Sequence, residues 1–193
     1  MQTIPRTSRM LYKRPAIPTP HRLQPVLSFL LLSTLLLGYP YAASAQYDWT
    51  TVGSVGSVDE ADQGKVVNNG SIVALKPEAT GTVNLHYNVV SVGGLFGGSG
   101  IELGVRFRDN GPEARVVVRL RRYALVTGET TTLLTLNSNN FQPQEGFQLR
   151  TALDCSLRLD FFDYAYFLDV TLTKTGDAGT PALAVIQLAS VRC

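Results

Sequence analysis

The arginines between residues 106 and 121 are the side chains of this chain best suited to binding an anion. The arginines alternate with other residues in two apolar segments, and a tyrosine continues the alternation. Because successive side chains of a β-strand point to opposite faces, this spacing predicts one sheet face that carries guanidinium and phenol groups. Guanidinium groups bind carboxylate and sulfate through paired hydrogen bonds, so the face could hold an acidic carbohydrate or another envelope or extracellular protein. The candidate binding residues are Arg106, Arg115, Arg119, Arg121 and Tyr123.

A solvated sheet face is the plainer interpretation of the same residues. Arginines can pair with nearby acidic residues, and their aliphatic stems can cover apolar side chains that would otherwise meet water. The sequence offers Glu102, Glu113 and Glu129 for the first role and Val117 and Leu133 for the second. Under both interpretations the arginines lie on the outside of a sheet.

Two groups of carboxylates could support chemistry on a polysaccharide, because glycoside hydrolysis needs two carboxylates about 5 to 10 Å apart. The residues concerned are Asp59, Glu60 and Asp62 in one loop, and Asp160 and Asp163 in another. The first group could also bind Ca²⁺, although it lacks the ligand spacing of an EF-hand loop. Acidic loop residues more often solvate the surface or form turns. A polysaccharide hydrolase or lyase is therefore the alternative to a non-catalytic binding or structural module.

The single histidine after residue 45, His86, limits the remaining chemistry. One histidine excludes a zinc site of the HExxH type and sites built from several histidines. The chain has no G-x-S-x-G nucleophile motif, and the glycine-rich stretch 93–100 leads into a predicted strand, whereas phosphate-binding loops lead into a helix. These observations predict no cofactor, and they favour a module without catalytic residues.

The N-terminal region resembles a secretory signal peptide in its order of segments. Five basic residues precede a largely apolar run from Val26 to Leu37, which is followed by Ala43-Ser44-Ala45. Residues 1–45 are therefore expected to be removed before Gln46, leaving a secreted protein, extracellular or periplasmic, that meets the membrane only transiently. A retained membrane anchor is the rival interpretation, but the run is shorter than the roughly 20 residues that span a bilayer.

Removal of residues 1–45 changes the sign of the net charge. The whole chain has 17 basic and 15 acidic residues, and the five basic residues before Gln46 are matched by no acidic one. The remaining chain has 12 basic and 15 acidic residues, a formal charge of −3. An acidic domain lacks the basic surface that nucleic acids require, so no nucleic-acid partner is predicted.

Both cysteines, Cys155 and Cys193, lie in the exported part of the chain. Disulfides form and persist in the oxidising compartments outside the cytosol. A Cys155–Cys193 disulfide is therefore predicted, in which the terminal cysteine fastens the last strand.

The elements that must position these residues are predicted to be strands, since alternating patterns are interrupted by Gly, Asn, Asp or Pro about every ten residues. In segment 81–90 Val83, Leu85 and Tyr87 share one face. The stretch 101–136 is expected to form three consecutive antiparallel strands with one buried face. This arrangement pairs Phe107 with Val116 and Leu103 with Leu120, and the following turn pairs Leu120 with Leu134 and Val118 with Leu136.

The C-terminal third completes the predicted architecture. Short strands are expected at 148–153 and 156–161, and a long strand at 165–174 is expected to pair with an antiparallel return at 183–191. The whole is predicted to be a single all-β domain, residues 46–193. Its expected fold is an antiparallel β-sandwich of eight or nine strands, either jelly-roll-like or another Greek-key or meander arrangement.

Overall fold

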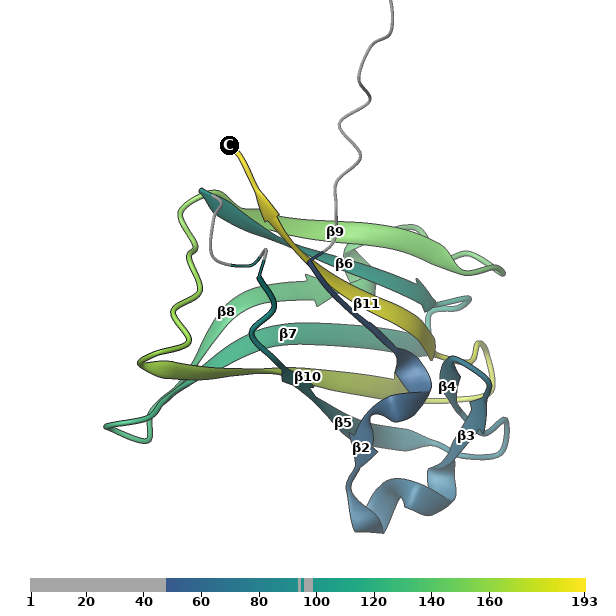
Figure 1. The fold of residues 1–193 in the computed structure, drawn as a ribbon. Coiled ribbons are helices and arrows are strands. Elements are labelled where there is room, and N and C mark those ends of the chain that lie inside the picture. Colours follow the sequence, from purple (N-terminus) through teal and green to yellow (C-terminus); the bar gives the residue numbers. More distant parts are fainter. Residues whose placement is uncertain (1–47, 94, 96–98) are drawn as a thin grey trace, which may run out of the picture. The chain divides into compact units, whose positions relative to one another are not determined.

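The computed structural model describes residues 48–93, 95 and 99–193, and the predicted signal peptide lies outside the described residues. Two antiparallel sheets pack against each other, as Figure 1 shows, which confirms the predicted all-β sandwich. Eleven strands are present in this part of the chain, more than predicted, because several of them have only two to four residues. No helix among the described residues is long and apolar enough to cross a membrane.

The six-stranded sheet has the order β3-β4-β11-β6-β9, and β1 also pairs with β11. The five-stranded sheet has the order β2-β5-β10-β7-β8. The strands of the first are β1 (Trp49–Val52), β3 (Val66–Asn69), β4 (Ile72–Leu75), β6 (Gly100–Arg108), β9 (Gln148–Asp154) and β11 (Ala182–Val191). Those of the second are β2 (Ser57–Val58), β5 (Gly81–Val89), β7 (Ala114–Ala124), β8 (Thr130–Asn137) and β10 (Tyr164–Lys174). Three short 3-10 helices join them: η1 (Gly53–Val55), η2 (Glu60–Lys65) and η3 (Ser138–Asn140).

The core forms between the sheets from the faces that the alternation predicted. Leu103, Val105 and Phe107 of β6 are fully buried, as are Val118 and Leu120 of β7. Burial of such side chains contributes about 1.5–3 kcal/mol each. The register of the β7–β8 hairpin is also as predicted from Val118 to Leu120. A bulge after Leu120 then shifts the partner of each later β7 residue by one.

The predicted three-stranded meander is wrong, because β6 and β7 belong to different sheets. β6 pairs with β11 and β9, so Phe107 lies opposite Leu183 and Gln148 and does not pair with Val116. Asn110 takes part in the crossing between sheets, since its Oδ1 accepts a hydrogen bond of 2.7 Å from Thr180 N. An alternating pattern marks a buried face, but both layers of a sandwich bury one, so the pattern does not choose between a hairpin and a crossing.

The same ambiguity affects the C-terminal strands. β10 and β11 lie in different sheets, so the predicted pairing of segments 165–174 and 183–191 is wrong. Residues 156–161 form turns and irregular structure instead of the predicted strand, whereas β9 confirms the strand predicted at 148–153.

The predicted disulfide between Cys155 and Cys193 is confirmed. β6 lies between β9 and β11, and its first residues pair with Asp154 on one side and Val191 on the other. The two cysteines therefore follow strand ends that lie on either side of β6. Gly100 makes room for the link, since a Cβ there would lie 2.8 Å from Cys155 Cα and 3.1 Å from Cys193 Sγ.

Tyr87 of β5 anchors the turn η1 inside the sandwich. Its side chain is 4% exposed, and its hydroxyl donates a hydrogen bond of 2.6 Å to Gly53 O. Gly56 permits the contact, because a Cβ there would lie 2.4 Å from the Tyr87 ring. Burial raises the pKa of Tyr87 above its ordinary value.

Replacing Tyr87 with phenylalanine is expected to lower the free energy of unfolding by about 1–2 kcal/mol, because Gly53 O loses its buried donor. Wild-type stability should be complete well below about pH 10, the ordinary pKa at which the unfolded tyrosine is half ionised. It should then decline as the pH rises toward the raised folded-state pKa. The variant should lack this decline, apart from the part due to Tyr166, whose pKa burial also raises. Urea unfolding at neutral and alkaline pH measures both effects, and equal alkaline losses in the two proteins would contradict the assignment.

Candidate functional site

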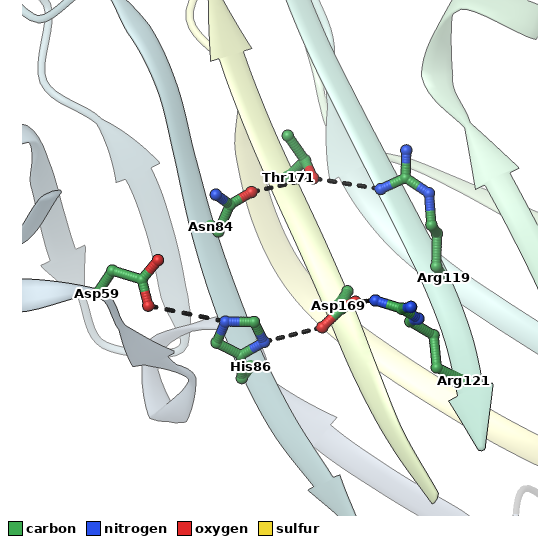
Figure 2. A network of polar contacts seen from close by, with 7 residues as sticks. All are labelled: Asp59, Asn84, His86, Arg119, Arg121, Asp169 and Thr171. Atoms are coloured by element: carbon green, nitrogen blue, oxygen red, sulfur yellow. Dashed lines mark hydrogen bonds and ion pairs between the residues drawn. The ribbon is translucent and has the colours of Figure 1, made fainter. Parts of the chain in front are cut away.

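The outer face of the five-stranded sheet carries polar side chains joined in two sets of contacts, shown in Figure 2. They come from its three central strands, which places them in adjacent rows: His86 of β5, Asp169 of β10 and Arg119 of β7 lie in register, as do Asn84 and Thr171 one row along. We call this surface the polar face. It consists of Asn84, His86, Arg115, Arg119, Arg121, Asp169 and Thr171.

One set of contacts on the polar face joins three strands through Thr171. Its hydroxyl donates to Asn84 Oδ1 at 3.3 Å and accepts from Arg119 Nη1 at 3.4 Å. The hydroxyl thus satisfies an amide on one side and a guanidinium on the other. This contact holds the Arg119 side chain toward β10.

A second set of contacts on the polar face is centred on Asp169. His86 Nδ1 lies 2.8 Å from Asp169 Oδ1, and Arg121 Nη1 donates to Asp169 Oδ2 at 2.5 Å. The Arg121 guanidinium also lies 5.7 Å from the centre of the Phe167 ring. The other ring nitrogen of His86, Nε2, is 3.7 Å from Asp59 Oδ1. The charge of Arg121 is therefore compensated by Asp169, and two carboxylates flank one imidazole.

Arg115 and Arg119 have no carboxylate partner in the part of the chain that the structure describes. The contact of Arg115 is to an amide, from its Nε to Asn137 Oδ1 at 3.2 Å. Val117 points outward between these arginines and yet is 3% exposed, as expected if their stems cover it. The face thus combines a covered apolar centre with two guanidinium groups that form no ion pair among the described residues.

The structure separates the arginines that the sequence grouped together. Arg115, Arg119 and Arg121 share the polar face, and Tyr123 follows them at the end of β7, where it is half-exposed. Arg106 does not join them, because β6 lies in the six-stranded sheet, where Arg106 pairs with Val185 and Leu149. The pattern along each strand is the same in both sheets, so it could not show this separation.

A pocket of about 270 Å³ adjoins the polar face at His86. Thr51, Val55 and Ser57 form one wall, and His86 and Asn88 form the other. His86 therefore contributes to both the face and the pocket, and a chain laid along the face could place a branch there.

The predicted carboxylates make separate local contacts. Asp62 pairs with Lys65 at 2.8 Å, whereas Asp59 faces His86. Asp160 Oδ1 accepts from Phe162 N at 2.9 Å and serves a turn. Among the described residues, no three histidine, cysteine or acidic side chains are gathered as a metal site would need. Binding of Ca²⁺ by Asp59, Glu60 and Asp62 stays a prediction.

Sequence reasoning missed Asn84, Asp169 and Thr171 as members of the site. The alternation of β5 did place Asn84 and His86 on a polar side. What was missing is the pairing of β5 with β10 and of β10 with β7, which joins strands about 80 and about 50 residues apart. No local signal in the sequence indicates such distant partners.

No known protein family and no curated protein matches this sequence. Solved structures similar to the chain include the enzymatically active domain of tailspike protein 4 of bacteriophage CBA120 (13% identity, TM-score 0.41). The match covers 72% of this chain but only 18% of the tailspike chain. They also include TmCBM61 in complex with β-1,4-galactotriose (11% identity, TM-score 0.44), with 72% of this chain and 90% of that chain covered. A third is the family 11 carbohydrate-binding module of a cellulosomal cellulase of Clostridium thermocellum (9% identity, TM-score 0.40), with 75% of this chain and 87% of that chain covered. At these identities and TM-scores the similar structures give no basis for a function of this chain. A function has to be argued from the chemistry of the polar face.

Proposed function

We propose that residues 46–193 form an exported, non-catalytic carbohydrate-binding module that holds an acidic polysaccharide on the polar face. The observation that carries the proposal is a pair of guanidinium groups on the outer sheet face, those of Arg115 and Arg119, which form no ion pair among the described residues. The confirmed disulfide supports an extracellular or periplasmic location, since such bonds persist outside the cytosol. The signal peptide predicted at residues 1–45 supplies the route of export.

The geometry of the polar face suits an extended anionic chain. Arg115 and Arg119 are four residues apart on one strand, which separates their Cα atoms by about 14 Å. A polymer with regularly spaced carboxylate or sulfate groups can therefore meet both cations along β7. Asn84 and Thr171 provide hydrogen-bonding groups for its hydroxyls in the adjacent strands.

Replacing both Arg115 and Arg119 with alanine is expected to weaken binding to polygalacturonate at least tenfold, because each charge-assisted hydrogen bond contributes about 1.5–3 kcal/mol. Arg106→Ala is the matched control, since it removes an exposed arginine from the opposite sheet and should leave binding unchanged. Affinity electrophoresis and calorimetry measure the effect, with a neutral glucan as the uncharged comparison. Wild-type affinity should fall as salt is added, because exposed charges are screened.

Equal binding by the double variant and the wild type would refute the polar face as the site. Equal binding of polygalacturonate and the neutral glucan would refute the acidic specificity. A polysaccharide hydrolase or lyase is the second candidate, favoured by the meeting of Asp59 and Asp169 at His86. Release of reducing ends from polygalacturonate by wild type, and its loss in His86→Ala, would support that alternative.

A further inference from the structure

A second pocket lies at the opposite end of β6 from the disulfide. It has a volume of about 350 Å³ and forms between the loop joining β6 to β7 and the segment that follows β8. Asp109 and Pro112 come from the first loop, and Asn139, Phe141 and Gln142 from the second. We call it the loop pocket. Its volume lies in the range of small-molecule sites, about 300–1,000 Å³.

The walls of the loop pocket are fixed by hydrogen bonds. Gln144 N donates to Asp109 O at 2.9 Å, which ties the two loops together. Val116 N donates to the buried Ser138 Oγ at 2.8 Å, which fastens η3 to β7. The Phe141 ring contacts Phe107 of the core, with ring centres 6.4 Å apart. A pocket held in this way is formed before any ligand arrives, which reduces the entropy cost of binding.

Asp109 is the unusual group in this pocket. It is 3% exposed, its Oδ1 has no hydrogen-bond partner, and no cationic side chain in the described part of the chain pairs with it. A buried carboxylate oxygen without a partner is unfavourable, so its presence in a folded protein requires an explanation, such as a ligand that pairs with the group. A bound positive charge in the pocket would provide that pairing.

We propose that the loop pocket binds an amino sugar, whose ammonium group pairs with the Asp109 carboxylate. The carboxylate disfavours anionic ligands, and the volume accommodates a sugar ring together with its ammonium group. Asn139 and Gln142 offer amide groups for ring hydroxyls, while Phe141 and Pro112 offer apolar contact to the ring. A metal ion fits less well, since no three histidine, cysteine or acidic side chains gather among the described residues. This site is independent of the polar face.

The test compares three sugars that differ at one substituent: glucosamine, N-acetylglucosamine and glucose. Calorimetry on the purified protein is expected to give at least tenfold tighter binding of glucosamine than of the two neutral sugars. Asp109→Asn keeps the shape of the side chain and removes its charge, so it should abolish this preference. The Arg119→Ala protein should bind glucosamine like the wild type, because Arg119 contacts Thr171 and no residue of the loop pocket, and this result separates the two sites.

Thermal unfolding provides a second readout that a merely structural Asp109 would not reproduce. Without ligand, Asp109→Asn should raise the midpoint by a few degrees, because an uncompensated buried charge is removed. With glucosamine present, only the wild type should gain further stability. The proposal is overturned if glucose and glucosamine bind equally, if glucosamine does not bind, or if the variant keeps the preference. Asp109-dependent stabilisation by CaCl₂ alone would overturn it as well, in favour of a metal site.

Discussion

Replacing both Cys155 and Cys193 with alanine is expected to lower the free energy of unfolding by about 4 kcal/mol. The disulfide closes a loop with a sequence separation of 38 residues, and the entropy of that loop in the unfolded chain sets the estimate. Domains of this kind have total stabilities of about 5–15 kcal/mol, so the loss is a large fraction. Urea unfolding of the oxidised wild type and the double variant measures it directly.

Reduced wild-type protein is the matched control for this prediction. Dithiothreitol should lower the stability of the wild type to that of the variant and leave the variant unchanged. The alkylation of two thiols in the purified, unreduced protein would show that the bond is absent, and equal stabilities of the oxidised and reduced forms would show that it contributes nothing.

Replacing Gly53 with alanine is expected to cost at least about 3 kcal/mol, beyond the usual range for an overpacked site, because the obstacle is backbone. A Cβ at this position would lie 2.1 Å from Leu183 O and 3.2 Å from Val73 Cγ1. Relief of the first contact requires η1 or the start of β11 to move, and any shift of η1 also displaces the acceptor of the Tyr87 hydroxyl.

Gly64→Ala is the control for this substitution, because a Cβ at Gly64 would meet no atom within 4 Å. Alanine there should change stability by no more than about 1 kcal/mol. Circular dichroism during urea unfolding compares the two variants. A Gly53→Ala protein as stable as Gly64→Ala would mean that β11 does not lie against η1 as described.

The buried faces could be predicted from the sequence, whereas the partners of the strands could not. Leu103 and Val118 were both assigned correctly to the core, because alternation depends only on the strand that carries it. Whether β6 pairs with β7 or crosses to the other sheet depends on contacts with β11, about 80 residues away. The disulfide was predicted from the compartment and the count of cysteines, and it needed no correct topology.

The candidate site was predictable only along β7. Arg115, Arg119 and Arg121 lie on one strand, so their common face follows from local spacing. Arg106 was grouped with them on an assumed strand pairing, and Asp169 and Thr171 were missed because their strand, β10, was given the wrong neighbour. Asp109 showed no signal at all, since the burial that makes it unusual arises when two loops meet.

The position of β11 in the six-stranded sheet affects how the chain reaches its folded state. The last strand in the sequence is the neighbour of β1, β4 and β6, so that sheet has no centre until the final residues have been synthesised. Pairings between distant segments form slowly, because the chain must close long loops first. A nascent chain leaving the ribosome therefore cannot complete this domain before its C-terminus appears.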